Sequence, residues 1–160
     1  MKSMTQSSRI FAVNRRARFD YEISETIEAG IILLGTEIKA MREGRVNLSD
    51  AYARNMSGEI YLINAHIGQY SNTSPDTNHE PKRSRKLLLR KSQISKIISQ
   101  LDERGFTLVP IKIYLKRNRA KIELGVGRGK KLYDKRRSLI EKERNREAQR
   151  ALSHKQKEFD

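Results

Sequence analysis

Alternation of apolar and polar residues over 107–126 constrains the fold of this chain more than any other feature. The apolar positions on the first arm are Val109, Ile111, Ile113 and Leu115, and those on the return arm are Ile122, Leu124 and Val126. Successive side chains of a strand point to opposite faces, so this period of two predicts a β-hairpin that turns near Asn118. One face is expected in the core, and the other carries Lys112, Lys116 and Lys121.

Three further stretches have strand character. Residues 19–33 alternate in the same way, and 52–67 predict a second hairpin with its turn at Ser57-Gly58. The three leucines of 87–89 predict a buried strand flanked by basic residues. Most of the chain is therefore expected to be antiparallel β-structure.

Two short helices are expected between these strands. The first spans 35–44, with Thr36 as its cap and Gly44 as its end. The second spans 91–105, where apolar residues recur at helical spacing. The absence of any βαβ alternation favours a mainly β fold, a small OB-like antiparallel barrel with flanking short helices.

The chain divides into three parts by composition. Residues 1–13 are expected to be a flexible N-terminal segment, and 14–131 the barrel. Residues 132–160 form a basic tail with high helix propensity but an interrupted apolar stripe. Such a tail cannot bury enough apolar surface to fold alone, so it is expected to be disordered when free.

The charge balance predicts an anionic partner. Lys plus Arg number 34 and Asp plus Glu number 19, which gives a formal net charge of +15. Nucleic acid is the first candidate. A membrane surface is less suitable, because the basic residues lie on strands and not on one face of an amphipathic helix. Aromatic residues are few, which favours recognition of a folded RNA by its backbone and shape.

Several classes of site are excluded or disfavoured. The chain has no cysteine, so disulfides, thiolate metal sites and a cysteine nucleophile are excluded. No histidines are paired at metal-ligand spacing, and no catalytic constellation of carboxylates is visible, so neither a metal, a cofactor nor an enzyme activity is expected. No apolar run suits a secretory signal or the about 20 residues of a membrane span, so a cytoplasmic protein is expected.

The glycine-rich stretch GVGRGKK (125–131) does not fit a nucleotide-binding loop. A Walker loop would need glycine where Leu124 stands and Ser or Thr where Lys131 stands. The stretch is instead expected to be a strand that leaves the barrel. Lys130 and Lys131 are then either solvated or in contact with RNA phosphates.

Two further residues are candidate RNA contacts. His79 lies in a polar loop, where it could donate a hydrogen bond to RNA or simply be exposed. Glu28 could accept a hydrogen bond from a base edge or a 2′-hydroxyl, or be a solvated carboxylate. A non-specific RNA-binding barrel, such as a translation or ribosome-associated factor, is an alternative function. An RNA-processing enzyme would need catalytic residues that the sequence does not show.

Four motifs together resemble the family of SsrA-binding proteins (small protein B), the partners of transfer-messenger RNA in ribosome rescue. They are NRRARFDY (14–21), EAGIILLGTEIKAMREG (28–44), the NH-x-P-x-R-x-RKLLL stretch (78–89) and GKKLYDKR (129–136). The resemblance implies an OB-like fold that binds the tRNA-like domain of transfer-messenger RNA and delivers it to stalled ribosomes. It implies a cytoplasmic monomer that acts with the ribosome and an elongation factor.

The resemblance also implies site residues. Asn14, Glu28, Leu88 and Lys121 match positions that the family uses for RNA binding. The other predicted RNA-binding residues are Arg15, Arg16, Arg18, His79, Arg83, Arg85, Lys86, Lys130 and Lys131. The implied ribosome-contacting residues of the tail, which becomes helical on the ribosome, are Tyr133, Asp134, Lys135, Arg136, Ala151 and Leu152.

Overall fold

The computed structural model describes residues 8–103 and 105–158 and contains two compact units, Met1–Gly129 and Lys130–Asp160. The strands of the first unit are β1 (Arg9–Val13), β2 (Tyr21–Ile31), β3 (Val46–Asn47), β4 (Tyr52–Met56), β5 (Glu59–Ile63), β6 (His66–Ile67), β7 (Arg85–Leu88), β8 (Phe106–Lys116) and β9 (Arg119–Gly129). Its helices are α1 (Ala17–Asp20), α2 (Gly35–Arg42), the 3₁₀ turn η1 (Pro75–Thr77) and α3 (Lys91–Asp102). The second unit contains α4 (Leu132–Glu158).

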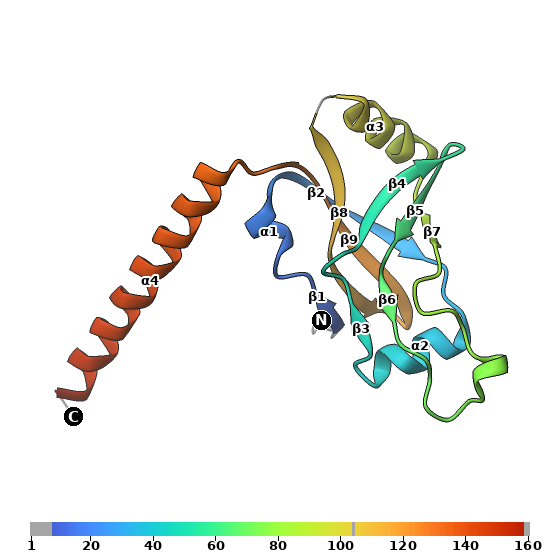
Figure 1. Cartoon of the computed structure of the whole chain (residues 1–160), viewed down its shortest axis with the longest axis horizontal. Helices are drawn as coiled ribbons and strands as arrows, with labels where there is room; N and C mark the ends of the chain where they lie inside the picture. The colour runs from blue at the N-terminus through green and yellow to red at the C-terminus, as the bar shows by residue number, and fades with distance from the viewer. Residues whose placement is uncertain (1–7, 104, 159–160) are drawn as a thin grey trace, which may run out of the picture. The chain divides into compact units, whose positions relative to one another are not determined.

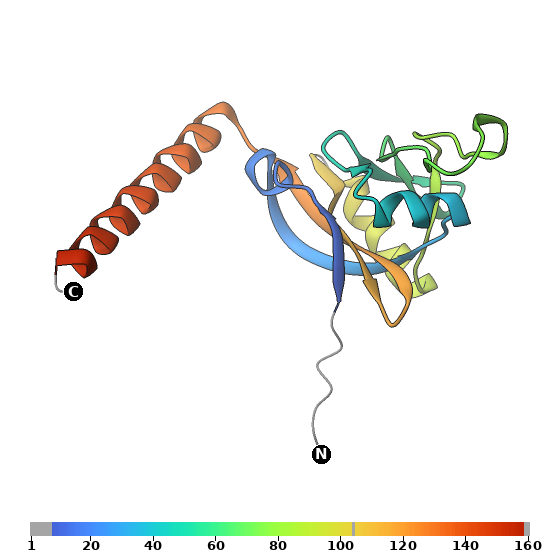
Figure 2. The same cartoon turned by 90° about the horizontal axis from the view of Figure 1, so that it is seen from below.

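The strand order of the first unit begins and ends at β8. The pairings run β8–β4–β5–β7–β2–β9, and β9 pairs again with β8, while β1 adds to β8. All of these pairings are antiparallel. The expected OB-like, mainly β fold is therefore confirmed. Helices α2 and α3 lie at opposite ends of the sheet (Figures 1 and 2).

The two hairpin turns form where the sequence predicts them. Ser57 and Gly58 have φ of 53° and 83°, and Arg117 and Asn118 have φ of 51° and 59°. Positive φ at both central residues is typical of a type I′ turn, whose twist matches that of the strands. Gly44, with φ of 79°, follows α2 at its expected end.

The core differs from the sequence prediction along β8. Ile122, Leu124 and Val126 of β9 belong to the core as expected, and Val109, Ile111 and Ile113 of β8 are buried as expected, but the β8 residues of the main core cluster are Leu108 and Ile113. The pairing of β8 with β9 shifts register between Pro110 and Lys112. This bulge inserts one residue and so exchanges the two faces of the strand, which the simple alternation could not show.

The N-terminal boundary also needs correction. Residues 1–7 lie outside the described part of the chain, but Arg9–Val13, expected to be flexible, form strand β1. Arg9 pairs with Leu115 and Val13 pairs with Lys112. The register shift at Phe11 interrupts the alternation that would have identified this strand.

The tail is a single helix in the structure, whereas the sequence favours disorder in the free chain. The described side chains of α4 are exposed or half-buried. Spaced charges such as Arg137 and Glu141, which lie 3.8 Å apart, support the helix. Because the described side chains of α4 form no buried apolar face, its helical content in the free chain stays a prediction.

Candidate nucleic-acid interface

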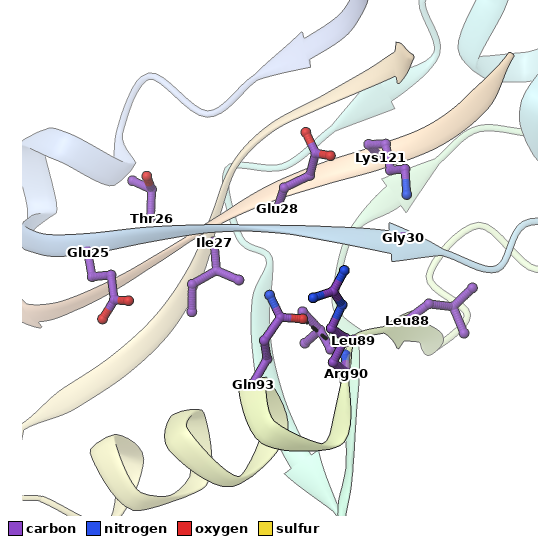
Figure 3. A pocket seen from close by; sticks show the side chains of 10 residues that line it. All are labelled: Glu25, Thr26, Ile27, Glu28, Gly30, Leu88, Leu89, Arg90, Gln93 and Lys121. Atoms are coloured by element: carbon purple, nitrogen blue, oxygen red, sulfur yellow. Dashed lines mark hydrogen bonds between the residues drawn. The ribbon is translucent and has the colours of Figure 1, made fainter. Parts of the chain in front are cut away.

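A groove of about 740 Å³ runs beside β2. Its lining, called the β2 groove here, consists of residues 25–28 and Gly30 of β2, residues 88–90, Gln93 of α3 and Lys121 of β9 (Figure 3). Strand β2 pairs with β7 at Gly30 and Ile31. Earlier along β2, the start of α3 takes the place of β7 beside the strand, and the groove lies between them.

Glu25 and Gln93 fix the side of the groove that α3 forms. Glu25 accepts hydrogen bonds from Lys96 Nζ at 2.7 Å and from Gln100 Nε2 at 3.1 Å. These contacts, the Lys96 bond first, lower the pKa of Glu25. Gln93 Oε1 accepts from the Arg90 N–H at 3.0 Å at the start of α3. The helix is thereby held against the strand whose residues line the groove.

Leu88 is an apolar side chain held at the surface. It lies across from Gly30 in the β2–β7 pairing and is 52% exposed. A Cβ added at Gly30 would lie 3.1 Å from the Leu88 Cβ. Glycine at this position therefore allows Leu88 to approach β2 closely, which puts an apolar surface inside a mostly polar groove.

Glu28 is engaged by two groups on β8. Its carboxylate accepts a hydrogen bond from the Tyr114 hydroxyl and lies 3.4 Å from Lys116 Nζ. The Tyr114 bond is the largest influence and lowers the pKa of Glu28; burial opposes it, and the charges of Lys116 and Lys121 add to it. Glu28 is therefore ionised at neutral pH and available as an acceptor.

A second pocket of about 480 Å³ continues from the groove at the tip of the β8–β9 hairpin. Its lining is Glu28, Lys116, Arg117, Arg119 and Lys121, so it shares Glu28 and Lys121 with the β2 groove. Four cationic side chains surround one carboxylate. Such a concentration of positive charge attracts phosphate groups.

The sequence matches a protein-family model described as "SmpB protein" over residues 11–154. The chain belongs to the SmpB family. A protein named SsrA-binding protein from Thermosynechococcus vestitus is 49% identical over 152 residues, which are 95% of this chain and 100% of that relative. One from Bacillus cytotoxicus is 53% identical over 151 residues, which are 94% of this chain and 97% of the relative.

A solved structure described as "tmRNA-SmpB: a journey to the center of the bacterial ribosome" is also similar. It has 48% sequence identity and a TM-score of 0.64, and the match covers 76% of this chain and 85% of the other. The residues that match the SmpB family, 11–154, include the lining of the β2 groove, the lining of the second pocket at the β8–β9 hairpin and most of α4.

Within this SmpB fold, three of the predicted RNA-binding residues meet in one place. Glu28, Leu88 and Lys121 come from β2, β7 and β9 and all line the β2 groove. Among the described residues, no carboxylate lies within ion-pair distance of the Lys121 ammonium.

Arg83 and Arg85, by contrast, bind a buried carboxylate. Glu37 of α2 is fully buried and accepts from Arg85 Nε at 2.8 Å and from Arg83 Nη2 at 2.8 Å. Arg85 is also fully buried, and it donates to the carbonyl oxygens of Ala65 and Pro81 at 2.8 and 3.0 Å. Arg85 therefore holds the fold together and cannot reach RNA, which corrects its predicted role.

His79 is also structural. It is 4% exposed, and its ring nitrogens lie 2.8 Å from the Ile67 carbonyl oxygen (Nε2) and 2.9 Å from the Thr36 hydroxyl (Nδ1). The carbonyl can only accept, so Nε2 donates and Nδ1 accepts from Thr36 in the neutral ring. Both nitrogens are occupied, so the predicted donation to RNA is wrong, and Thr36 serves His79 in place of capping α2.

Asn14 also makes structural contacts, while its role in RNA binding stays a prediction. It is 7% exposed, and its Nδ2 donates to the carbonyl oxygens of Leu48 and Pro110 at 3.2 and 3.0 Å. Its backbone N–H donates to the Ile111 carbonyl at 2.7 Å. Asn14 thus ties the end of β1 to β8 and to the segment before β4.

The remaining predicted residues of the first unit lie at the surface but outside the two pockets. Arg15, Arg16 and Arg18 are exposed, and Arg16 Nε lies 3.7 Å from Asp20. Lys86 Nζ lies 3.7 Å from Glu59. The structure does not bring these four residues into the β2 groove.

In the second unit, Lys130 donates to the Ser138 hydroxyl at 3.0 Å, which in turn donates to the Asp134 carbonyl at 3.0 Å. The other predicted residues of this unit are mainly exposed: Lys131, Tyr133, Asp134, Arg136, Ala151 and Leu152, with Lys135 half-buried. Tyr133 is 75% exposed, a surface that a partner could cover.

The sequence analysis missed several lining residues. Arg90, Arg117 and Arg119 belong to the pockets, and Tyr114 contacts Glu28. The two hairpin arginines could have been identified from the predicted turn near Asn118, because turn residues project into solvent. Arg90 and Tyr114 could not be identified in this way, because their place in the site depends on how distant parts of the chain come together in the fold.

Within 8–103 and 105–158, no group of three or more His, Cys, Asp or Glu side chains could hold a metal ion. No helix in the described part of the chain is long and apolar enough to cross a membrane.

Proposed function

We propose that this SmpB-family chain binds the tRNA-like domain of transfer-messenger RNA (SsrA) and delivers it to stalled ribosomes for trans-translation. The relatives named SsrA-binding protein and the neighbour described as tmRNA-SmpB in the ribosome support this assignment. The observation that carries it is the meeting of Glu28, Leu88 and Lys121, from three separate strands, in one groove.

The chemistry of the groove suits folded RNA. Lys121 and the hairpin arginines neutralise phosphates, while the apolar Leu88 packs against a ribose or a base face. Glu28 accepts a hydrogen bond from a 2′-hydroxyl or a base amino group. Each contact is made to the RNA surface and none requires a catalytic step, so we assign a binding factor and not an enzyme.

The tail serves a second step in this proposal. Helix α4 forms against ribosomal RNA in the messenger channel, and residues 133–136 begin the contact near the decoding centre. Its many cationic side chains and its lack of a buried face suit a segment that is ordered by a partner. The protein acts as a cytoplasmic monomer together with the elongation factor that delivers aminoacyl-tRNA.

The salt dependence of RNA binding tests this proposal. Lys121→Ala should weaken binding of the tRNA-like domain and reduce the slope of log affinity against log salt by about one, because one phosphate contact is lost. Lys39→Ala is the matched control, since Lys39 is exposed on α2 and lines neither of the two pockets. Equal slopes for wild type and Lys121→Ala would contradict the groove assignment. Equal affinity for an unrelated folded RNA of the same length would instead support the non-specific alternative.

A further inference from the structure

Tyr114 is a buried tyrosine on the outer face of the sheet. It pairs across the hairpin with Lys121, so the two side chains share the face on which the groove lies. Even so, Tyr114 is only 7% exposed. The Lys112 ammonium lies 5.4 Å from the centre of its ring, and its hydroxyl donates to Glu28.

A buried hydroxyl needs a hydrogen-bond partner, and here the partner is a groove residue. Tyr114 donates to Oε2 of Glu28, and the Lys116 ammonium lies 3.4 Å from both carboxylate oxygens, so the hydroxyl engages one oxygen and the ammonium both. The tyrosine ring is rigid and packed, whereas a glutamate on an open strand face would sample several rotamers. The hydroxyl therefore restricts the carboxylate to one orientation.

We propose that Tyr114 is the positioning residue for Glu28: it fixes the carboxylate so that Oε1 is presented to the RNA before binding. This inference rests on the proposed function of the β2 groove. Preorganisation of this kind raises affinity because the ordering cost is met in the free protein. Tyr114 itself does not touch the RNA and acts through Glu28.

The charges around Glu28 are consistent with this role. Lys116 on β8 and Lys121 on β9 favour the carboxylate, while Glu123 lies across from Glu28 in the β2–β9 pairing. Arg119 completes the pocket on the hairpin. The Tyr114 hydrogen bond remains the largest contribution that lowers the pKa of Glu28, and burial followed by the Glu28 bond raises the pKa of Tyr114.

An NMR titration without RNA tests the first half of the inference. The carboxyl carbon of Glu28 is followed against pH in the wild type and in Tyr114→Phe, which keeps the ring and removes the hydroxyl. The folded pKa of Glu28 should be higher in Tyr114→Phe, because the main stabiliser of the ionised form is gone. Tyr70→Phe is the control, since the Tyr70 hydroxyl accepts from Asn72 on a loop outside the groove. An unchanged midpoint in Tyr114→Phe would overturn the proposal.

A double-mutant cycle on binding of the tRNA-like RNA domain tests the second half. Tyr114→Phe should weaken binding about fivefold to tenfold, as expected when one flexible side chain has to be ordered on binding. In the Glu28→Gln background the same change should have less than about a twofold effect, because a positioning residue acts only through its target. Equal losses in both backgrounds, or no loss in the first, would overturn the role of Tyr114.

The two experiments separate this inference from the proposed function. If Glu28→Gln and Lys121→Ala both bind the RNA like wild type, the assignment of the β2 groove to RNA binding is wrong. The proposal that Tyr114 positions Glu28 for RNA is then wrong too, even if Tyr114→Phe raises the pKa of Glu28. If those variants lose affinity and Tyr114→Phe does not, only the positioning role is refuted. The melting temperature of each variant checks that the fold is retained.

Discussion

Glu37→Gln should strongly destabilise the protein. The carboxylate of Glu37 is completely buried between Arg85, also completely buried, and Arg83, whose side chain is 31% exposed. Removing its charge leaves the Arg85 guanidinium in the interior with only neutral acceptors. Breaking a buried ion pair in this way costs about 3–5 kcal/mol. For a unit of this size, that loss corresponds to a fall in melting temperature of about 10–20 °C.

Matched variants show whether the unpaired charge is the cause. Arg83→Ala should cost only about 1 kcal/mol, because Arg83 is partly solvated and Glu37 keeps Arg85. The double variant Glu37→Leu with Arg85→Met removes both buried charges and should recover much of the stability lost in Glu37→Gln. A melting temperature of Glu37→Gln within about 2 °C of wild type would refute the reasoning.

The same cluster predicts a pH dependence. Burial raises the pKa of Glu37, but the Arg83 hydrogen bond, the Leu34 N–H and the charge of Arg85 together bring it below its ordinary value of 4.5. A carboxyl with a depressed folded pKa contributes stability above its unfolded pKa and loses it as pH falls through the folded one. In urea unfolding, the stability difference between wild type and Glu37→Gln should therefore shrink below about pH 4.5. A difference that is constant down to about pH 3 would contradict this.

Three further perturbations follow from the fold. Gly127→Ala should cost about 1–3 kcal/mol in urea unfolding, because its Cβ would lie 2.5 Å from the Glu22 carbonyl oxygen, whereas Gly129→Ala, with nothing within 4 Å, should be near neutral. Asn14→Ala should also cost about 1–3 kcal/mol in urea unfolding, since two buried carbonyls lose their donor; a neutral result would mean that water replaces the amide. Circular dichroism of the free chain should show little helix from α4. Ala148→Pro, which costs about 3 kcal/mol in a formed helix, should abolish peptide tagging on stalled ribosomes without weakening RNA binding. Normal tagging by this variant would rule out the helix as the active form of the tail.

The sequence predicts the local elements well. Helix α3 and the two type I′ turns depend on nearby residues, so periodicity and turn chemistry identify them. The faces of β8 were harder, because the bulge between Pro110 and Lys112 reverses the alternation that identifies the strand. Strand β1 escaped detection for the same kind of reason, an irregular register.

The candidate site shows a different limit. Arg85, His79 and Asn14 belong to residue types that are usually exposed, and in this fold each is buried because distant carbonyls satisfy its donors. Those carbonyls come together only in the folded chain. Glu28 and Lys121 were identified through family resemblance, and their shared groove required the pairing of β2 with β9.

The closure of the sheet by β9 determines when the protein can fold during synthesis. Tyr21 of β2 pairs with Gly129, and Gly30 pairs with Lys121, so β2 must wait for nearly all of the first unit to be made. At synthesis rates of about 5–20 residues per second, this delay is roughly 5–20 s. Throughout that interval the nascent chain presents an unpaired strand edge, the kind of surface that promotes aggregation. The β8–β9 hairpin, whose contacts are local, can form within microseconds of its release and then serve as the template on which β2 docks.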